Sequence, residues 1–244
     1  MQLDILAIGP HPDDVEIGIG GTLIKHVQMG YKVGIVDLTA GESGTNGTPE
    51  IRRQEALRAA EIMGVATRDC LGLPDARLAV NEEMLRPIIE IIRRYRPQVV
   101  LGPYSKDRHP DHLRAHQLVR EAAHVAGFWK YPADGEAHRP PVVLQYFLGG
   151  RAEPTLVVDI SPYHELKMAA ICAHASQFGI REDVELQTYL NDPEFLRFMR
   201  VRDQYMGSLI QVAYGEGIVM DEQVAIGDLM TLQGRLRQTK KRER

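Results

Sequence analysis

The sequence is poor in cysteine and in long apolar runs, and both shortages exclude classes of protein. Its 244 residues include two cysteines, Cys70 and Cys172, which lie far apart and form no Cys-x-x-Cys unit. Neither a disulfide framework nor a thiolate metal site is indicated. No apolar stretch approaches the roughly 18 residues of a membrane span, and the first residues lack the basic segment of a signal peptide. We therefore expect a cytoplasmic protein without a membrane partner.

An excess of positive charge is also missing. The 29 Lys and Arg residues are outnumbered by 33 Asp and Glu residues, which gives a formal net charge of −4. Such a chain has no overall attraction for nucleic acid. Basic residues gather only in 235–244, which we expect to be a flexible, solvated tail rather than a nucleic-acid-binding arm. We predict a single domain over 1–234, because one domain can accommodate a chain of this length. Such a chain also buries a large core and needs no structural metal to fold.

Apolar runs alternate with helical patterns in the first half of the chain. Buried strands are predicted at 3–9, 31–39, 66–73 and 98–101, and helices at 17–29, 50–63, 81–95 and 110–126. The second half is less regular, with two β-rich runs at 142–147 and 155–160 and helices from Ser161 and Pro193. Strands that alternate with helices form a parallel sheet between helical layers. We predict an α/β, doubly wound, mostly parallel, Rossmann-like sheet in three layers, with an irregular α+β extension towards the C-terminus.

Metal-ligand side chains follow the first and the fourth predicted strands. The segment His11-Pro12-Asp13-Asp14 comes directly after the first strand, and Arg108-His109-Pro110-Asp111-His112 follows the fourth strand after a short loop. In doubly wound sheets, ligands bind beyond the carboxyl ends of the strands, where the strand order reverses. The first and fourth strands commonly flank that crevice. We therefore expect the two segments to converge.

The residue types in these segments suit a catalytic zinc ion. Such a site commonly uses two histidines and one carboxylate and leaves a position open for water. His11 and Asp14 supply two ligands from one tight turn, and His112 supplies the third. Zinc lowers the pKa of its bound water to about 7, and Asp13 is the candidate general base that accepts the water proton. Fe²⁺ or another divalent ion suits the same donors.

His109 and Asp111 complete the second segment. His109 is a candidate to protonate a leaving amine or to stabilise an oxyanion. Asp111 is a candidate to hold the His109 ring in one tautomer. Each motif taken alone has a plainer interpretation, as a capped turn or as a solvated helix start. Their shared position after apolar strands favours a metal-dependent hydrolase.

The two motifs resemble the signatures of a known family. GPHPDDVEIG (9–18) resembles the (A/G)HPDDxE motif of the LmbE-like, or PIG-L, deacetylases, and RHPDH (108–112) resembles their second motif. LTAGESGTNGTPEIRRQEA, LGLPDARL, ASQF (175–178) and YGEGI (214–218) are similar in the same order. The resemblance covers nearly the whole chain. It points to the bacillithiol-biosynthesis branch, which hydrolyses N-acetylglucosaminyl malate to glucosaminyl malate.

The resemblance implies roles for eight residues. It implies a zinc ion with His11, Asp14 and His112 as ligands, Asp13 as general base, His109 with Asp111 as partner dyad, and Arg52 and Asp75 as contacts to the sugar. It also implies a small N-acetyl sugar conjugate as substrate and a homo-oligomer such as a hexamer. Ala76 stands where a glycine commonly follows Asp75. Tyr189 is a candidate for the active-site tyrosine of some relatives, with a packing role as the alternative.

Further residues have two interpretations. Arg108 is a candidate to bind an anionic group such as a malate carboxylate, since Arg binds carboxylates through two parallel hydrogen bonds; a surface ion pair is the alternative. Glu16 is interpreted as structural or as a support of the motif. The histidines outside the motifs, His174 among them, lack ligand spacing to the motifs, and most of them are expected at the surface or in packing.

Other functions compete with hydrolysis of N-acetylglucosaminyl malate. A deacetylase acting on another N-acetyl sugar or thiol conjugate is one alternative, and a non-catalytic metal- or sugar-binding module is another. A dinucleotide-binding enzyme is a third, because Asp37 stands near the end of the second strand where a ribose would bind. The turn after the first strand, however, lacks the G-x-G-x-x-G pattern of such enzymes.

Overall fold

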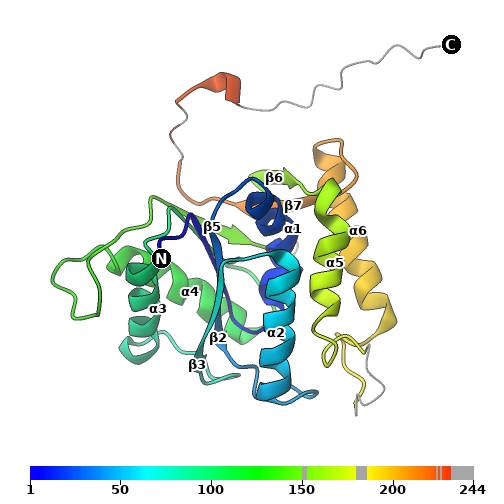
Figure 1. Ribbon diagram of the computed structural model, residues 1–244, viewed down its shortest axis with the longest axis horizontal. Coiled ribbons are helices and arrows are strands. Elements are labelled where there is room, and N and C mark those ends of the chain that lie inside the picture. Colours follow the sequence, from blue (N-terminus) through cyan, green and yellow to red (C-terminus); the bar gives the residue numbers. More distant parts are fainter. Residues whose placement is uncertain (150–152, 180–185, 224, 226, 232–244) are drawn as a thin grey trace.

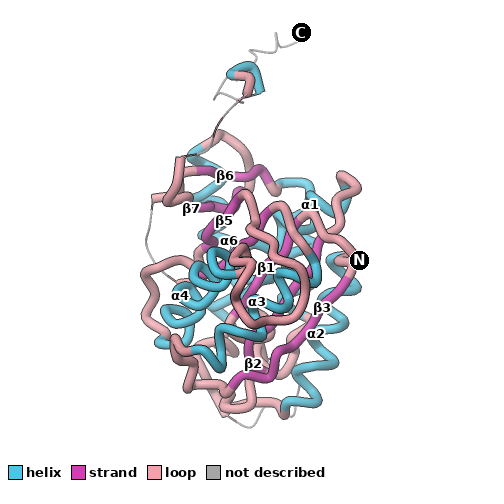
Figure 2. The backbone as a smooth tube through the Cα atoms, turned by 90° about the vertical axis from the view of Figure 1, so that its left-hand side faces the viewer, coloured by secondary structure: helices cyan, strands magenta, loops and turns pink. Residues whose placement is uncertain are grey.

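The computed structural model describes residues 1–149, 153–179, 186–223, 225 and 227–231. Seven strands form one sheet in the order β3-β2-β1-β4-β5-β7-β6. They are β1 (Ile5–Gly9), β2 (Val33–Thr39), β3 (Thr67–Leu73), β4 (Val99–Pro103), β5 (Val142–Tyr146), β6 (Leu156–Asp159) and β7 (Gly215–Val219). Strands β1 to β5 pair in parallel, while β7 pairs antiparallel with both β5 and β6. Figure 2 shows β5, β7 and β6 together towards one end of the sheet and β2 and β3 towards the other.

Helices cover both faces of the sheet. They are α1 (Asp14–Gln28), α2 (Pro49–Met63), α3 (Glu82–Tyr95), α4 (Pro110–Val125), α5 (His164–Cys172) and α6 (Pro193–Leu209), with short 3₁₀ helices at Ser161–Tyr163 and Leu229–Thr231. Figure 1 shows α3 and α4 on one side of the sheet and α1, α2, α5 and α6 on the other. One apolar cluster joins the sheet to α3 and α4, and a second joins it to the remaining helices. The predicted three-layer, doubly wound fold is confirmed.

Local sequence signals set several helix ends. Thr48 caps α2 by accepting a hydrogen bond from the Ile51 N–H, and Gly64 ends this helix at a φ of +70°. Asn81 caps α3 by accepting a hydrogen bond from the Met84 N–H at 3.0 Å. Helix α1 begins at Asp14, three residues before the predicted start, because the His-Pro-Asp-Asp turn itself forms the beginning of the helix.

The second half differs most from the prediction. The segment Gly215–Val219 is not predicted as a strand, yet it forms β7 and inserts between β5 and β6. Two glycines in its five residues give a weak local strand signal, so its pairing partners determine its conformation. The tail 235–244 lies outside the described residues, and the single domain over 1–234 stays a prediction. No helix among the described residues has the length and apolarity that a membrane crossing requires.

The strand order places a crevice where the two motifs emerge. Strand β1 pairs with β2 on one side and with β4 on the other. The helices that follow β1 and β2 lie on one face of the sheet, and the helices that follow β3 and β4 lie on the opposite face. The strand order therefore reverses between β1 and β4. The loops that follow these two strands therefore diverge and leave room for a ligand between them.

Candidate active site

The structure brings the two histidine-aspartate motifs together beyond β1 and β4. The ring centroid of His11 lies 5.0 Å from that of His109 and 5.5 Å from that of His112, and the His109 and His112 centroids are 4.7 Å apart. His11, Asp14 and His112 each offer a donor atom within 4.8 Å of the other two. His11, His109 and Asp111 form a second set by the same measure.

Asp14 lies between the imidazoles of the first set. Its Oδ2 is 3.0 Å from His11 Nδ1 and its Oδ1 is 3.5 Å from His112 Nε2. Two ligand atoms bound to one tetrahedral zinc are separated by about 3.3 Å, given bonds of about 2.0–2.1 Å. Burial would raise the pKa of Asp14, but the charges of His112 and His11 lower it to about 2. The spacing and the ionised carboxylate fit one shared divalent ion.

Each of the two imidazoles has an acidic partner behind it. His11 Nε2 lies 3.1 Å from Asp75 Oδ1 and 3.5 Å from Asp111 Oδ2. His112 Nδ1 lies 3.2 Å from Asp107 Oδ2. A carboxylate at the far nitrogen of a metal-binding histidine fixes the ring orientation and strengthens the ligand. Asp107 is not among the predicted site residues, although an acidic residue in the loop that leads into the second motif is an available signal.

The protonation of the two imidazoles also fits a cation site. Burial opposes the charged form of both rings, yet the carboxylates of Asp111, Asp14 and Asp75 raise the pKa of His11 well above its ordinary value. Burial is likewise outweighed at His112, where Asp14 and Asp107 raise the pKa. The surrounding carboxylates thus favour a positive charge at this place. A divalent ion supplies such a charge, and its binding competes with protons for the ring nitrogens.

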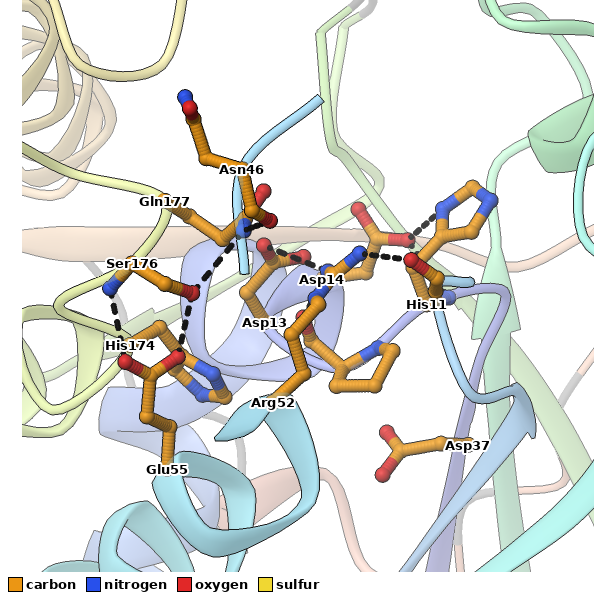
Figure 3. A network of polar contacts seen from close by, with 12 residues as sticks. His11, Asp13, Asp14, Asp37, Asn46, Arg52, Glu55, His174, Ser176 and Gln177 are labelled. Atoms are coloured by element: carbon orange, nitrogen blue, oxygen red, sulfur yellow. Dashed lines mark hydrogen bonds and ion pairs between the residues drawn. The ribbon is translucent and has the colours of Figure 1, made fainter. Parts of the chain in front are cut away.

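Asp13 faces Arg52 beside the metal-ligand set. Asp13 Oδ2 lies 3.3 Å from Arg52 Nη2, and Figure 3 shows the two side chains pointing towards one another. Arg52 also donates to the carbonyl oxygens of Pro12 at 2.8 Å and Gly41 at 3.0 Å. Burial raises the pKa of Asp13 to about 6, against the opposing charge of Arg52. A carboxylate that titrates this close to neutrality suits a proton acceptor.

The backbone at Asp13 is strained. Its φ is +120°, in the region that L-residues rarely adopt and that Asp, Asn and Gly tolerate best. Asp13 precedes the first residue of α1, but its side chain makes no capping hydrogen bond. The plainer interpretation of this residue as a helix cap is therefore wrong. Backbone strain of this kind concentrates at functional sites.

Arg52 and Asp75 hold the site together through contacts within the protein. Arg52 is only 4% exposed, and its guanidinium joins the turn after β1 to the loop at Gly41. Asp75 accepts the Ser43 N–H at 2.8 Å and lies against His11. Both residues line the same pocket as the metal-ligand set. Sugar binding by these two side chains stays a prediction, whereas their contacts describe a positioning role.

The His109 ring is held by the backbone of Asp111, and the expected carboxylate contact is wrong. The Asp111 N–H donates to His109 Nδ1 at 3.2 Å. The Asp111 carboxylate instead accepts the N–H groups of Ala76 at 2.7 Å and Leu78 at 3.3 Å. The reason is local, because His109 is the N-cap of α4 and its side chain meets the free amides of the first turn.

This hydrogen bond sets the tautomer of His109. Because Nδ1 accepts, the neutral ring carries its proton on Nε2. Burial and the charges of the two neighbouring imidazoles lower the pKa of His109. The neutral ring with a free Nε2–H is a hydrogen-bond donor suited to an oxyanion.

A buried ion network lies behind the first turn of α1. Arg68 donates to Asp37 at 2.7 and 2.9 Å and also pairs with Glu16. His174 Nε2 lies 3.0 Å from Glu16 Oε1, and His174 is fully buried. His174 is therefore a buried histidine that pairs with Glu16, not a surface residue. Asp37 is engaged by Arg68, so it is not available to a ribose.

The ASQF segment (175–178) is hydrogen-bonded to α2 and to the loop between β2 and α2, part of which lines the pocket. Ser176 donates to Glu55 of α2 through its N–H and its Oγ, each at 2.7 Å. Gln177 donates to the Asn46 carbonyl oxygen at 2.7 Å, which ties this segment to the loop between β2 and α2. Figure 3 shows this chain of contacts beside Arg52 and Asp13.

A pocket of about 610 Å³ opens onto the metal-ligand set. Its outer wall is mainly aromatic and aliphatic and includes Tyr189, Leu190, Phe195, Phe198 and Met199. The guanidinium carbon of Arg108 lies 4.5 Å from the ring centroid of Tyr189. In the described part of the chain, no carboxylate pairs with Arg108. The volume, and the combination of an apolar outer wall with polar groups around the metal-ligand set, are typical of a small-molecule site.

Comparison with known proteins agrees with this geometry. Residues 6–123 match the family model of the GlcNAc-PI de-N-acetylases, PIG-L. Diacetylchitobiose deacetylase of Thermococcus kodakarensis is 34% identical over 229 residues, which cover 88% of this chain and 81% of that protein. A probable N-acetyl-alpha-D-glucosaminyl L-malate deacetylase 2 of Bacillus subtilis is 29% identical, covering 79% of this chain and 92% of that one.

A solved structure extends the likeness to the whole fold. The conserved protein TT1542 from Thermus thermophilus superposes with a TM-score of 0.85 at 37% identity, covering 92% of this chain and 97% of that chain. The predicted family resemblance is confirmed. The chain belongs to the PIG-L, or LmbE-like, deacetylase family.

Proposed function

We propose that this protein hydrolyses the acetamide of an N-acetylglucosamine conjugate in a metal-dependent reaction that releases acetate and a free amine. The observation that carries the proposal is the position of Asp13, a buried carboxylate outside the ligand set of His11, Asp14 and His112 but in the same pocket. A binding module needs the ligands but has no use for this separate carboxylate. The relatives named as deacetylases of N-acetylated sugars support the same chemistry.

The residues of the pocket have separate roles in the proposed reaction. His11, Asp14 and His112 would hold zinc, and when bound it supplies Lewis acidity towards water and the amide carbonyl. Asp13 accepts the proton of the attacking water, and Arg52 keeps its carboxylate in place. The Nε2–H of His109 donates to the developing oxyanion. The water oxygen adds to the carbonyl carbon as the C=O π electrons move onto the carbonyl oxygen. The oxyanion then re-forms the C=O bond, the C–N bond breaks, and the proton held by Asp13 passes to the amine nitrogen.

Two conjugates are candidate substrates. N-acetylglucosaminyl malate is favoured by Arg108, whose guanidinium faces the pocket and suits a malate carboxylate. A chitobiose-type disaccharide is favoured by the outer wall, because Tyr189 and Phe198 offer exposed aromatic surface on which the apolar face of a second sugar ring packs. Loss of Arg108 should raise KM more for the malate conjugate than for a neutral one.

One experiment tests the proposed function. The purified protein is analysed for bound metal, stripped with a chelator and reloaded with Zn²⁺ or Fe²⁺. Amine release is then measured with N-acetylglucosaminyl malate, diacetylchitobiose and free N-acetylglucosamine. We expect turnover of at least one conjugate that disappears on stripping and returns on reloading. A protein that binds metal but releases amine from none of the three would contradict the proposal.

The proposal includes a reducing, cytoplasmic setting and a homo-oligomer of up to six chains. Cys70 and Cys172 are both free thiols, which suits that setting. Light scattering on the eluting protein measures the oligomeric state, and an eluting mass of one chain would contradict this part.

A further inference from the structure

Arg202 of α6 joins three separate segments at the edge of the pocket. One terminal nitrogen donates to the carbonyl oxygen of Ile17 in α1, and Nη1 donates to that of Leu148 at 3.3 Å. Nε and Nη2 donate to Asp203 Oδ1 at 3.3 and 3.2 Å. The side chain is one-fifth exposed and lines the pocket.

The first of these contacts reaches the turn that carries Asp14. Ile17 donates its N–H to the carbonyl oxygen of Asp13 at 3.0 Å, so its N–H and its carbonyl oxygen are both engaged. The first turn of α1 is therefore held from inside by its own hydrogen bond and from outside by Arg202. A shift of this turn would move both the candidate base and the aspartate ligand.

The second contact reaches the partner of His112. Leu148 precedes Gly149, whose N–H donates to Asp107 Oδ2 at 3.2 Å. The same oxygen lies 3.2 Å from His112 Nδ1. Arg202 thus fixes the peptide segment that positions Asp107, and Asp107 faces the histidine ligand.

The third contact anchors the guanidinium in the core. Asp203 also pairs with Lys167 at 2.7 Å, and Lys167 pairs with Glu216 at 2.7 Å. Glu216 in turn accepts the N–H groups of Gly21 and Thr22 in α1, at 2.9 and 2.6 Å. Lys167, Asp203 and Glu216 are at most 2% exposed.

This arrangement argues against a role for Arg202 in binding an anionic substrate. Two cations, Arg202 and Lys167, face two carboxylates, Asp203 and Glu216, so the cluster carries no excess positive charge. The guanidinium also donates its hydrogen bonds to two carbonyl oxygens and one carboxylate, all within the protein. Arg108, which pairs with no described carboxylate, differs in both respects.

We propose that Arg202 is a positioning residue of the metal centre, which links the α6 wall of the pocket to the separate segments that orient Asp14 and His112. The inference rests on the metal-ligand set of the proposed function. It adds that a residue of α6 sets the affinity of that centre for its ion. A substrate that contacts α6 therefore packs against an element tied to both sides of the metal site.

The test compares Arg202→Met and Arg202→Lys with Arg200→Met. Arg200 lies on the same helix and pairs with Glu165 at the surface, at 2.7 and 3.3 Å, so its loss removes the same charge without touching the site. The Kd for Zn²⁺ is measured by chelator competition on the metal-free protein in the absence of substrate. We expect about tenfold weaker binding in Arg202→Met and an unchanged Kd in Arg200→Met.

Two further measurements separate positioning from general stabilisation. Guanidinium ion at millimolar concentration should restore part of the Zn²⁺ affinity of Arg202→Met but not alter the wild type. Arg202→Lys keeps a positive charge beside Asp203, but its single ammonium group cannot contact the carbonyl oxygens of both Ile17 and Leu148. If Arg202→Met does not fold, Arg202→Lys replaces it in the comparison with Arg200→Met. We expect its Zn²⁺ affinity to be reduced and its kcat to fall about tenfold, with KM within about twofold of the wild type.

The outcomes distinguish this inference from the proposed function. If a folded Arg202→Met or Arg202→Lys protein binds Zn²⁺ as tightly as Arg200→Met does, the inference is overturned whatever the enzyme hydrolyses. If the wild type binds Zn²⁺ but releases no amine, the proposed function fails while the affinity comparison still decides the role of Arg202. If the wild type binds no divalent ion, both are wrong.

Discussion

The carboxylate of Asp13 and the guanidinium of Arg52 face each other at 3.3 Å, and neither side chain is more than 5% exposed. Burial favours the protonated carboxyl, whereas the guanidinium favours the ionised form. The two effects leave the pKa of Asp13 at about 6. The strength of the candidate base is therefore set by its burial together with a neighbour on α2, 39 residues away in sequence.

Replacement of Asp13 by Asn should separate metal binding from catalysis. The variant keeps the shape and the backbone preference of the aspartate but cannot accept a proton. We expect the metal content to be unchanged and kcat to fall by about 10²–10⁴-fold. Turnover within a factor of ten of the wild type would remove Asp13 as the base.

Loss of Arg52 should destabilise the fold. Arg52→Met leaves a buried carboxylate unpaired and frees the carbonyl oxygens of Pro12 and Gly41. Breaking a buried pair in this way costs about 3–5 kcal/mol in the free energy of unfolding, which urea denaturation measures. The adjacent and exposed Arg53 is the matched control, because Arg53→Met should change this free energy by less than about 0.5 kcal/mol. Equal effects of the two variants would contradict the assignment.

The activity should depend on pH through Asp13. The pKa of this carboxyl is raised, so its proton is lost only as the pH rises towards about 6. The base is ionised above that value, and kcat/KM should decline as the pH falls below it. A bound divalent cation adds positive charge and moves this limb towards lower pH, so we expect it at or below about pH 6 in the loaded enzyme. The pH profile of Asp13→Asn should lack this limb.

Asp107 should matter for the metal although it is not a ligand. Asp107→Asn removes the charge that faces His112 Nδ1 at 3.2 Å. Mutation of such an outer partner typically costs about 10–100-fold in metal affinity, which chelator competition measures. Lys106→Ala changes an exposed neighbour in the same loop and should leave the affinity unchanged. A Kd for Asp107→Asn equal to that of the control would show that His112 is oriented by other contacts.

Two glycines of α1 should respond in opposite directions to alanine. A Cβ at Gly18 would lie 2.2 Å from the ring of Tyr146, which is fully buried. We expect Gly18→Ala to lower the free energy of unfolding by about 1–3 kcal/mol. A Cβ at Gly20 would meet its nearest atom at 3.5 Å, an ordinary contact. Gly20→Ala should therefore raise stability by about 0.5–1 kcal/mol through helix propensity, and thermal unfolding compares the two.

The sequence predicts the first half of the fold well because its signals are local. Four strands appear as short apolar runs, and helix ends carry caps such as Thr48 and Asn81. Strand β7 escapes prediction because its conformation depends on partners that lie far away in the chain. The residues with ligand chemistry are identified by their type and by their place after β1 and β4.

The supporting residues cannot be read in the same way. His174 meets Glu16 across 158 positions, and Arg202 meets Ile17 across 185. Nothing local in the sequence distinguishes such side chains from surface residues. For Asp111 the residue type led to a wrong prediction. A carboxylate near His109 suggests a partner for its ring, but the Asp111 carboxylate accepts two loop N–H groups instead.

The φ of +120° at residue 13 narrows the choice of amino acid there before any chemistry is considered. Glutamate carries the same charge, but its longer side chain lacks the tolerance of aspartate for this region of the Ramachandran map. A residue at position 13 must therefore satisfy two conditions: it must adopt this backbone conformation, and it must accept a proton. Of the two carboxylic acids, aspartate is the one that suits both conditions, so the backbone of the turn favours aspartate over glutamate as the base.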